Sequence, residues 1–151
     1  MKNKNKKFSR GKFEEIFSKV PRLCVDLVIR KPEGILFTKR TIEPFKGSWH
    51  LPGGGVLLNE SLEDAAKRIS KTELGIEIEK LKRIGVIEFM EEKDNNIIRH
   101  SVSVVFLARP LTNEIILNED ADDYLFSKKI LKNIYPQQKE FLENNSEIFD
   151  F

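Results

Sequence analysis

The chain has 151 residues, of which 40% are hydrophobic and 33% are charged, and its net charge is +2. This size and balance are typical of a soluble globular domain that buries a core without disulfides. No apolar run approaches the roughly 18 residues needed to span a bilayer, so we expect no membrane partner. The start of the chain lacks the apolar core of a secretory signal, so we expect a cytoplasmic protein.

Basic residues gather in residues 1–12, ahead of the first acid, Glu14. Interleaved Lys and Asn are typical of a solvated tail, and no aromatic stacking platform accompanies them, so the sequence disfavours nucleic acid as a partner. We expect residues 1–12 to form a basic, disordered arm and residues 13–151 to form a single domain. The lone Cys24 lies in an apolar run and is expected to be buried. The sequence leaves a homodimer open.

The first half of the chain predicts a helix, a hairpin and a glycine loop. Apolar residues at helical spacing predict a short helix over 13–20, which a proline closes. Two β-rich runs, 23–30 and 35–40, flank a turn that contains proline and glycine, and they predict a hairpin. In the loop that follows, three glycines at 53–55 allow the backbone to approach a ligand closely.

The second half predicts one central helix followed by strands. Ser61 is expected to cap the helix and Gly75 to end it. Further elements are predicted as long strands over 82–91 and 97–109, shorter strands over 114–117 and 124–126, and a terminal helix from Pro136. This order predicts an α+β fold in which a mixed sheet packs between helices, an α/β/α sandwich.

Residues 53–76, GGGVLLNESLEDAAKRISKTELGI, combine a glycine turn with a capped helix and a sparse set of charges. They resemble the Nudix box, in which a glycine is followed after five residues by a glutamate and after seven more by R-E-U-x-E-E-x-G-U, where U is aliphatic. The residues that match are Gly54, Glu60, Arg68, Glu73, Gly75 and Ile76. The chain departs from the pattern at Ile69, Ser70 and Thr72, and the ordinary family carries magnesium-binding glutamates at two of these positions.

The reduced box is similar to that of one Nudix branch, the GDP-mannose mannosyl hydrolases, whose chemistry substitutes at sugar carbon rather than at phosphorus. The resemblance spans residues 20–126. It implies the Nudix fold, a nucleotide substrate and a Mg²⁺ cofactor, with Mn²⁺ as the alternative. By the same resemblance the Gly53 carbonyl and Glu73 are metal ligands. A further ligand of the branch, a glutamine, falls on Asp120, whose carboxylate suits magnesium better than an amide.

The resemblance also implies which side chains meet the substrate. Arg68 and Arg40 would face phosphate or the site acids, and Asp26 would stand near the sugar, where an anion stabilises developing positive charge. Tyr124 belongs to the implied substrate-binding residues. Structural alternatives stay open. Arg68 can instead form a salt bridge with Glu60 that braces the loop, and Asp26 can instead form a buried pair with Arg40.

Two positions depart from the branch in the catalytic machinery. Gly55 stands in place of an arginine that binds the leaving diphosphate, and Ala121 stands in place of the catalytic histidine. The sequence therefore does not identify a general base. His50, His100 and the acidic loop 119–123 are weaker alternatives, because each also has an ordinary structural explanation.

These observations lead us to expect a Mg²⁺-dependent hydrolase of a nucleoside diphosphate linked to another moiety, with a nucleotide sugar as the leading substrate. Two alternatives stay open. One is a catalytically weak or inactive nucleotide-binding module that kept the fold. The other is a pyrophosphohydrolase that attacks phosphorus, with its base in the loops after Phe89, where Glu91 and Glu92 are candidates.

Overall fold

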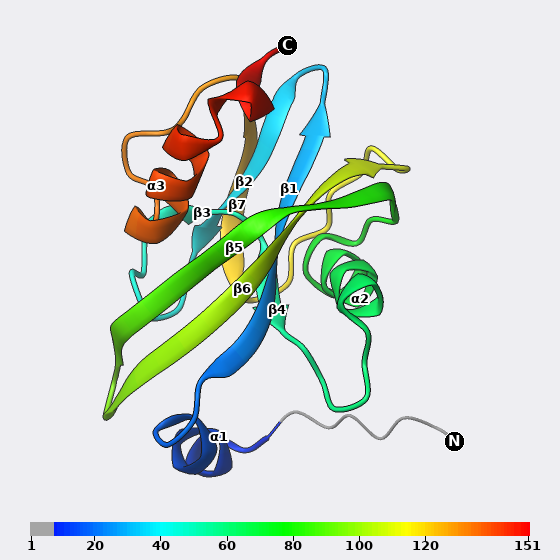
Figure 1. Ribbon diagram of the computed structural model, residues 1–151. Coiled ribbons are helices and arrows are strands. Elements are labelled where there is room, and N and C mark those ends of the chain that lie inside the picture. Colours follow the sequence, from blue (N-terminus) through cyan, green and yellow to red (C-terminus); the bar gives the residue numbers. More distant parts are fainter. Residues whose placement is uncertain (1–7) are drawn as a thin grey trace.

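The computed structural model describes residues 8–151 (Figure 1). Its helices are α1 (Arg10–Phe17), α2 (Leu62–Leu74), α3 (Pro136–Asn144) and the 3-10 helix η1 (Ser146–Phe149). Its strands are β1 (Arg22–Lys31), β2 (Gly34–Arg40), β3 (Trp49–His50), β4 (Gly53–Gly55), β5 (Ile78–Asp94), β6 (Ile97–Pro110) and β7 (Ala121–Ser127). The sheet lies between α2 on one side and α3 on the other (Figure 1), which confirms the predicted α+β class.

The strands form one mixed sheet in the order β3-β2-β1-β6-β5, with β4 beside β1 and β7 beside β2. Strand β1 runs parallel to β6 over residues 22–29 and antiparallel to both β2 and β4. The predicted hairpin of β1 and β2 is confirmed, with Arg30 opposite Ile35. The long hairpin of β5 and β6 is confirmed as well, and its first strand begins at Ile78, four residues before the predicted start at 82.

Alternate residues of β1 enter two different hydrophobic cores. Val25 and Leu27 are fully buried in the core that contains Ile69 of α2. Val28 is fully buried in the other core, with Phe141 of α3. Burial of each such side chain stabilises the fold by roughly 1.5–3 kcal/mol. Strand β1 therefore connects the two layers, and a polar residue on it lies inside the protein.

Helix α2 begins and ends where the sequence predicts. Ser61 Oγ accepts a hydrogen bond from the Asp64 backbone N–H at 3.1 Å. Gly75 follows the last turn with φ of 66°, in the left-handed region that favours glycine. The apolar side of the helix, with Ala65, Ala66 and Ile69 buried, faces the sheet. This packing fixes the direction in which the polar side chains of α2 point.

The strand predicted over 114–117 is wrong, because the segment pairs with a helix end instead of with the sheet. The Ile116 N–H donates to the Leu74 carbonyl at 2.8 Å, and the Asn118 N–H donates to the Glu73 carbonyl at 3.3 Å. Ile115 and Leu117 pack against the core. The alternating apolar pattern thus reflects a segment that satisfies free carbonyls in the last turn of α2.

The N-terminal helix starts earlier than predicted. Helix α1 begins at Arg10, within the range assigned to the basic arm, and Ser9 Oγ accepts from the Lys12 N–H at 3.3 Å. Residues 1–7 of the predicted arm lie outside the described residues. Cys24 is buried, as expected. Within residues 8–151 no helix is long and apolar enough to cross a membrane.

We predict that Gly75→Ala lowers the free energy of unfolding by about 1–2 kcal/mol, because an L side chain is strained in the left-handed region. An added Cβ would also stand 3.0 Å from the Ile116 Cβ. Urea denaturation measures the effect. Gly11→Ala in α1 is the control, since nothing lies within 4 Å of its Cβ position and its φ is not in that region. Equal stability of the two variants would contradict this account of the helix end.

Candidate active site

The glycine segment β4 approaches β1 at a position without ladder hydrogen bonds. Gly53 lies opposite Asp26. The Leu27 N–H donates to the Pro52 carbonyl at 2.8 Å on one side of this pair, and the Val56 N–H donates to the Leu23 carbonyl at 3.0 Å further along. In antiparallel pairing, hydrogen-bonded and open positions alternate. The N–H and carbonyl of Gly53 therefore point away from β1. The N–H donates to the Glu73 carboxylate, and the carbonyl is left to contact a ligand.

Asp26 is a buried carboxylate beside this segment, with 6% of its surface exposed. Its Oδ2 accepts a hydrogen bond from Gln138 Nε2 at 3.1 Å, so its partner is Gln138 rather than Arg40. Gln138 is fixed in turn, because its Oε1 accepts from the Leu51 N–H at 2.7 Å. Burial raises the pKa of Asp26 to about 6, against the lowering effects of Gln138, the Ser103 hydroxyl and Arg40. The carboxylate is thus held in place and still titrates near neutral pH.

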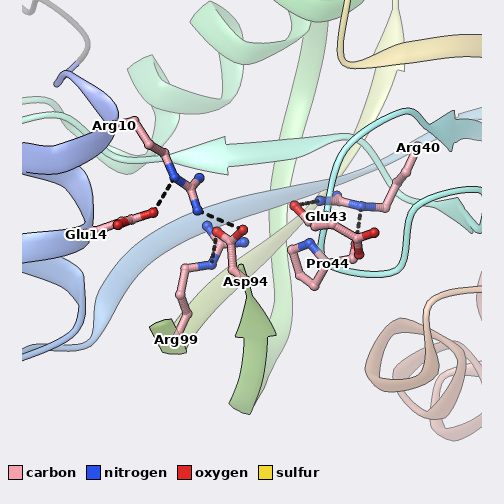
Figure 2. Close-up of polar contacts among 7 residues, drawn as sticks. All are labelled: Arg10, Glu14, Arg40, Glu43, Pro44, Asp94 and Arg99. Atoms are coloured by element: carbon pink, nitrogen blue, oxygen red, sulfur yellow. Dashed lines mark hydrogen bonds and ion pairs between the residues drawn. The ribbon is translucent and has the colours of Figure 1, made fainter. Parts of the chain in front are cut away.

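Arg40 is the cation of the site. Its Nε donates to the Pro44 carbonyl at 2.8 Å and its Nη2 to the Glu43 carbonyl at 3.4 Å, as Figure 2 shows. Its guanidinium lies 5.4 Å from the centre of the Tyr135 ring. Burial lowers the pKa of Arg40, and four nearby acids raise it. These acids come from four different segments and are Glu92, Asp26, Glu73 and Asp120.

Glu73 projects from the last turn of α2 next to the glycine segment. One of its carboxyl oxygens lies 3.7 Å from the Cβ position of Gly54. The side chain is half-buried, and desolvation raises its pKa to about 8. The negative charge of Asp120 raises the pKa further, whereas Arg40 lowers it. A half-buried acid with a raised pKa differs from an ordinary solvated residue at a helix end. Its ionised form would be stabilised by a nearby cation.

Glu73, Asp120 and the free carbonyl of Gly53 form a donor set that fits a hard divalent cation. All three offer oxygen, the element that Mg²⁺ and Mn²⁺ prefer. The repulsion between the two carboxylates is one that a bound cation would relieve. In the part of the chain that the structure describes, no three His, Cys, Asp or Glu side chains group closely enough to hold a metal. Water would therefore complete the coordination of a metal bound here.

Arg68 forms a salt bridge with Glu60. Its Nε donates to Glu60 Oε2 at 2.7 Å, and its Nη2 donates to Glu60 Oε1 at 3.0 Å and to the Gly55 carbonyl at 2.7 Å. The Glu60 side chain is 9% exposed and also accepts from the Leu57 N–H at 3.1 Å. This geometry matches the structural alternative given from the sequence, because the Arg68–Glu60 salt bridge connects the loop after β4 to α2. A role of Arg68 on substrate stays a prediction.

A second arginine reaches the glycine segment, and the sequence alone does not reveal it. The Arg22 guanidinium lies against Gly55, in the space that a Cβ at this position would need. The rings of Phe13 and Phe17 in α1 hold it at 5.0 and 5.5 Å from their centres. Gly55 therefore removes one side chain from the box and admits another cation beside it.

Ala121, Tyr124 and His50 lie around strand β2. Ala121 is paired with Arg40, so the position of the expected histidine adjoins the site. Tyr124 is paired with Thr38 and is 41% exposed. His50 is buried, and its Nδ1 lies 3.1 Å from Thr38 Oγ1. Burial and Arg40 hold the pKa of His50 well below its usual value, so this ring is a neutral structural group.

The structure separates the two acids after Phe89. The pairing of β5 with β6 shifts by one residue between Phe89 and Glu92. Glu91 takes up the extra residue with φ of 53° and is exposed. Glu92 turns inward and is 6% exposed, and burial raises its pKa to about 7. Of the two candidates only Glu92 faces the acids around Arg40.

Comparison with known proteins places this geometry among relatives. The family model described as NUDIX domain matches residues 20–144. The low-salt glycan biosynthesis protein Agl8 of Haloferax volcanii is 43% identical over 76 residues, 50% of this chain and 49% of that protein. An ADP-ribose pyrophosphatase of Methanocaldococcus jannaschii is 35% identical over 106 residues, 70% of this chain and 61% of that protein. The chain thus matches about half to three fifths of the length of these relatives.

A solved structure shows the same fold. The MutT NUDIX hydrolase of Burkholderia pseudomallei superposes with a TM-score of 0.72 and is 28% identical, over 82% of this chain and 97% of that chain.

We predict that Arg68→Ala lowers the free energy of unfolding by about 1–3 kcal/mol at pH 7, because it leaves the Glu60 carboxylate without its main donor. The hydrogen bond from Arg68 is the largest cause that lowers the pKa of Glu60 below its usual 4.5. The stabilisation is therefore complete above pH 4.5 and is lost as the pH falls through the lowered pKa.

Chemical denaturation at pH 7 and at acid pH measures this difference, which should shrink in acid. Lys67→Ala, an exposed position on the same helix, is the control. A loss of stability that does not depend on pH would show that Arg68 contributes by packing alone.

Proposed function

The chain belongs to the NUDIX domain family, and from this membership we propose that it is a Mg²⁺-dependent hydrolase of a nucleoside diphosphate linked to a sugar. One observation carries the proposal: Asp26, Glu73, Glu92 and Asp120 all lie close enough to influence Arg40. The pKa values of the first three acids are raised, so their full ionisation needs additional positive charge. A divalent cation held by these acids would meet this need and would supply positive charge toward a diphosphate.

Each residue of the site has a role in this proposal. Glu73, Asp120 and the Gly53 carbonyl would hold the metal, which would supply positive charge toward the diphosphate. Arg40 orders the wall that begins at Glu43 and faces phosphate. Arg22 offers a second guanidinium next to the glycine segment, where it matches a phosphate oxygen pair in shape and charge.

Asp26 stands near the sugar, where its carboxylate stabilises positive charge at the carbon that is attacked. Gln138 keeps this carboxylate oriented through the bond at 3.1 Å. The pKa of about 6 leaves Asp26 mostly ionised above neutral pH. The Agl8 relative, named for glycan biosynthesis, supports a sugar-linked substrate, as does the relative named ADP-ribose pyrophosphatase.

Attack at phosphorus is the second candidate reaction. The name of the pyrophosphatase relative favours it, as does the inward position of Glu92. Ala121 cannot accept a proton, so attack at carbon would lack the histidine base of the branch and should be slow. Hydrolysis in ¹⁸O water separates the two reactions. For the leading proposal we expect the label in the released sugar, and label in a phosphate group would establish attack at phosphorus instead.

We predict that Glu73→Gln raises the Mg²⁺ concentration needed for half-maximal hydrolysis by about 10- to 100-fold, the loss seen even for groups that only support a metal ligand. The amide keeps the size of the side chain and removes its charge. Initial rates at limiting magnesium measure the change. Glu63→Gln, in the first turn of the same helix, is the control. An unchanged magnesium dependence would remove Glu73 from the metal site.

A further inference from the structure

An open cavity of about 480 Å³ adjoins the site on the α3 side of the sheet. Residues 43–46 form one wall and residues 90–93 of β5 form the other, and Gln137 of α3 also lines it. The first wall is ordered by the hydrogen bonds that Arg40 donates to its backbone (Figure 2). Because Glu92 lies near Arg40 of the proposed active site and also lines the cavity, the cavity adjoins that site.

A bulge in β5 turns the Glu92 carboxylate toward this cavity. Regular alternation is broken at Glu91, so that Glu92 is buried while Met90 on the same strand is 55% exposed. Bulges of this kind re-aim side chains next to ligand sites. A buried carboxylate is costly unless it finds partners. Placing Glu92 in the cavity wall therefore lowers the stability of the fold.

Two buried acceptor atoms in this wall have no hydrogen-bond partner within the described part of the chain. They are Glu92 Oε2 and Gln137 Oε1. Buried polar atoms are nearly always satisfied, so two open acceptors in one wall indicate a ligand that donates hydrogen bonds.

The chemistry of the wall selects the ligand. A carboxylate and an amide oxygen accept hydrogen bonds from hydroxyl groups. The lining also contains Lys46 and Lys93, but its three carboxylates, those of Glu43, Glu91 and Glu92, outnumber these two cations and disfavour a phosphate. Pro44, Phe45 and Met90 supply apolar surface for the carbon face of a sugar ring. Asp26 helps to raise the pKa of Glu92, so the carboxylate assigned to the sugar carbon lies near this wall.

We propose that this cavity binds the sugar of the substrate, with sugar hydroxyls donating to Glu92 Oε2 and Gln137 Oε1. The proposal rests on the proposed function, because it assigns a place to the group that the diphosphate carries. It also gives the recognition of that group to β5 and α3, outside the Nudix-box segment 53–76.

Equilibrium titration at pH 8 tests the site without any need for turnover. The probes are ADP-ribose and GDP-mannose, with ADP and GDP as the matching nucleotides that lack the sugar. Wild type should bind the sugar-linked probe of at least one pair more tightly than its matching nucleotide. Glu92→Gln and Gln137→Ala should each weaken binding of that probe by about tenfold or more, the effect of losing a hydrogen bond to a strong acceptor. Binding of ADP and GDP should not change.

Glu88→Gln, an exposed carboxylate on the same strand, is the control and should behave as wild type. Melting temperatures of all variants establish that they are folded. Equal loss for ADP or GDP would overturn the assignment, because it would place base or phosphate in the cavity. A fall in kcat for Glu92→Gln with unchanged binding would also overturn it and make Glu92 an acid–base group.

The titration also separates this proposal from the proposed function. A wild type that binds sugar-linked probes preferentially, through Glu92 and Gln137, but hydrolyses none of them would keep the sugar site and reject the hydrolase. A wild type that hydrolyses them with no dependence on these two residues would keep the hydrolase and reject the sugar site. A wild type that binds neither sugar-linked probe would overturn both.

Discussion

The close approach of β4 to β1 is the constraint on which the site depends. Three glycines in succession make it possible, and each leaves room for a different side chain. At Gly53 the space is taken by Asp26, at Gly54 by α2 with Ile69 at 3.4 Å and the Glu73 carboxyl at 3.7 Å, and at Gly55 by the guanidinium of Arg22. A larger residue at Gly53 or Gly55 would displace Asp26 or Arg22, whereas at Gly54 an added Cβ would make ordinary contacts. The same register turns the N–H and carbonyl of Gly53 away from β1, because its pair with Asp26 falls at an open position of the ladder.

The electrostatics of the site follow from this crowding. Asp26 comes from the strand that connects both cores, Glu73 from the end of α2 and Glu92 from the bulge in β5, so the three acids reach the same region from both sides of the sheet. Burial raises the pKa of each, to about 6, 8 and 7 respectively. Arg40 lowers all three but is a single charge with its own hydrogen bonds to the loop after β2. The fold therefore holds several acids whose ionisation is disfavoured by burial, and in the proposed function a bound cation would favour their ionised forms.

Most of the fold was within reach of sequence reasoning, because its elements are specified locally. Ser61 and Gly75 mark the ends of α2 through short-range hydrogen bonds and backbone preference, and the period of apolar residues identifies its buried side. The glycine turn and the spacing of the box pointed to the family that the NUDIX domain match establishes. The incorrect prediction of a strand over 114–117 also follows from the local nature of the sequence pattern. Alternation reports that a segment is half-buried, and it does not report whether the partner is a strand or the carbonyls of a helix end.

The sequence by itself determined the α+β class, the helix that carries the box and the family of the chain, since these depend on neighbours a few residues apart. Tertiary structure alone decided the environment of the acids. Gln138 holds Asp26 from a position 112 residues away, and no local pattern connects the two. The bulge that turns Glu92 inward exists only in the pairing of β5 with β6, and Arg22 reaches Gly55 only because β4 lies beside β1. Burial and charge at a site are sums over long-range contacts, and such contacts come into being only when the chain packs.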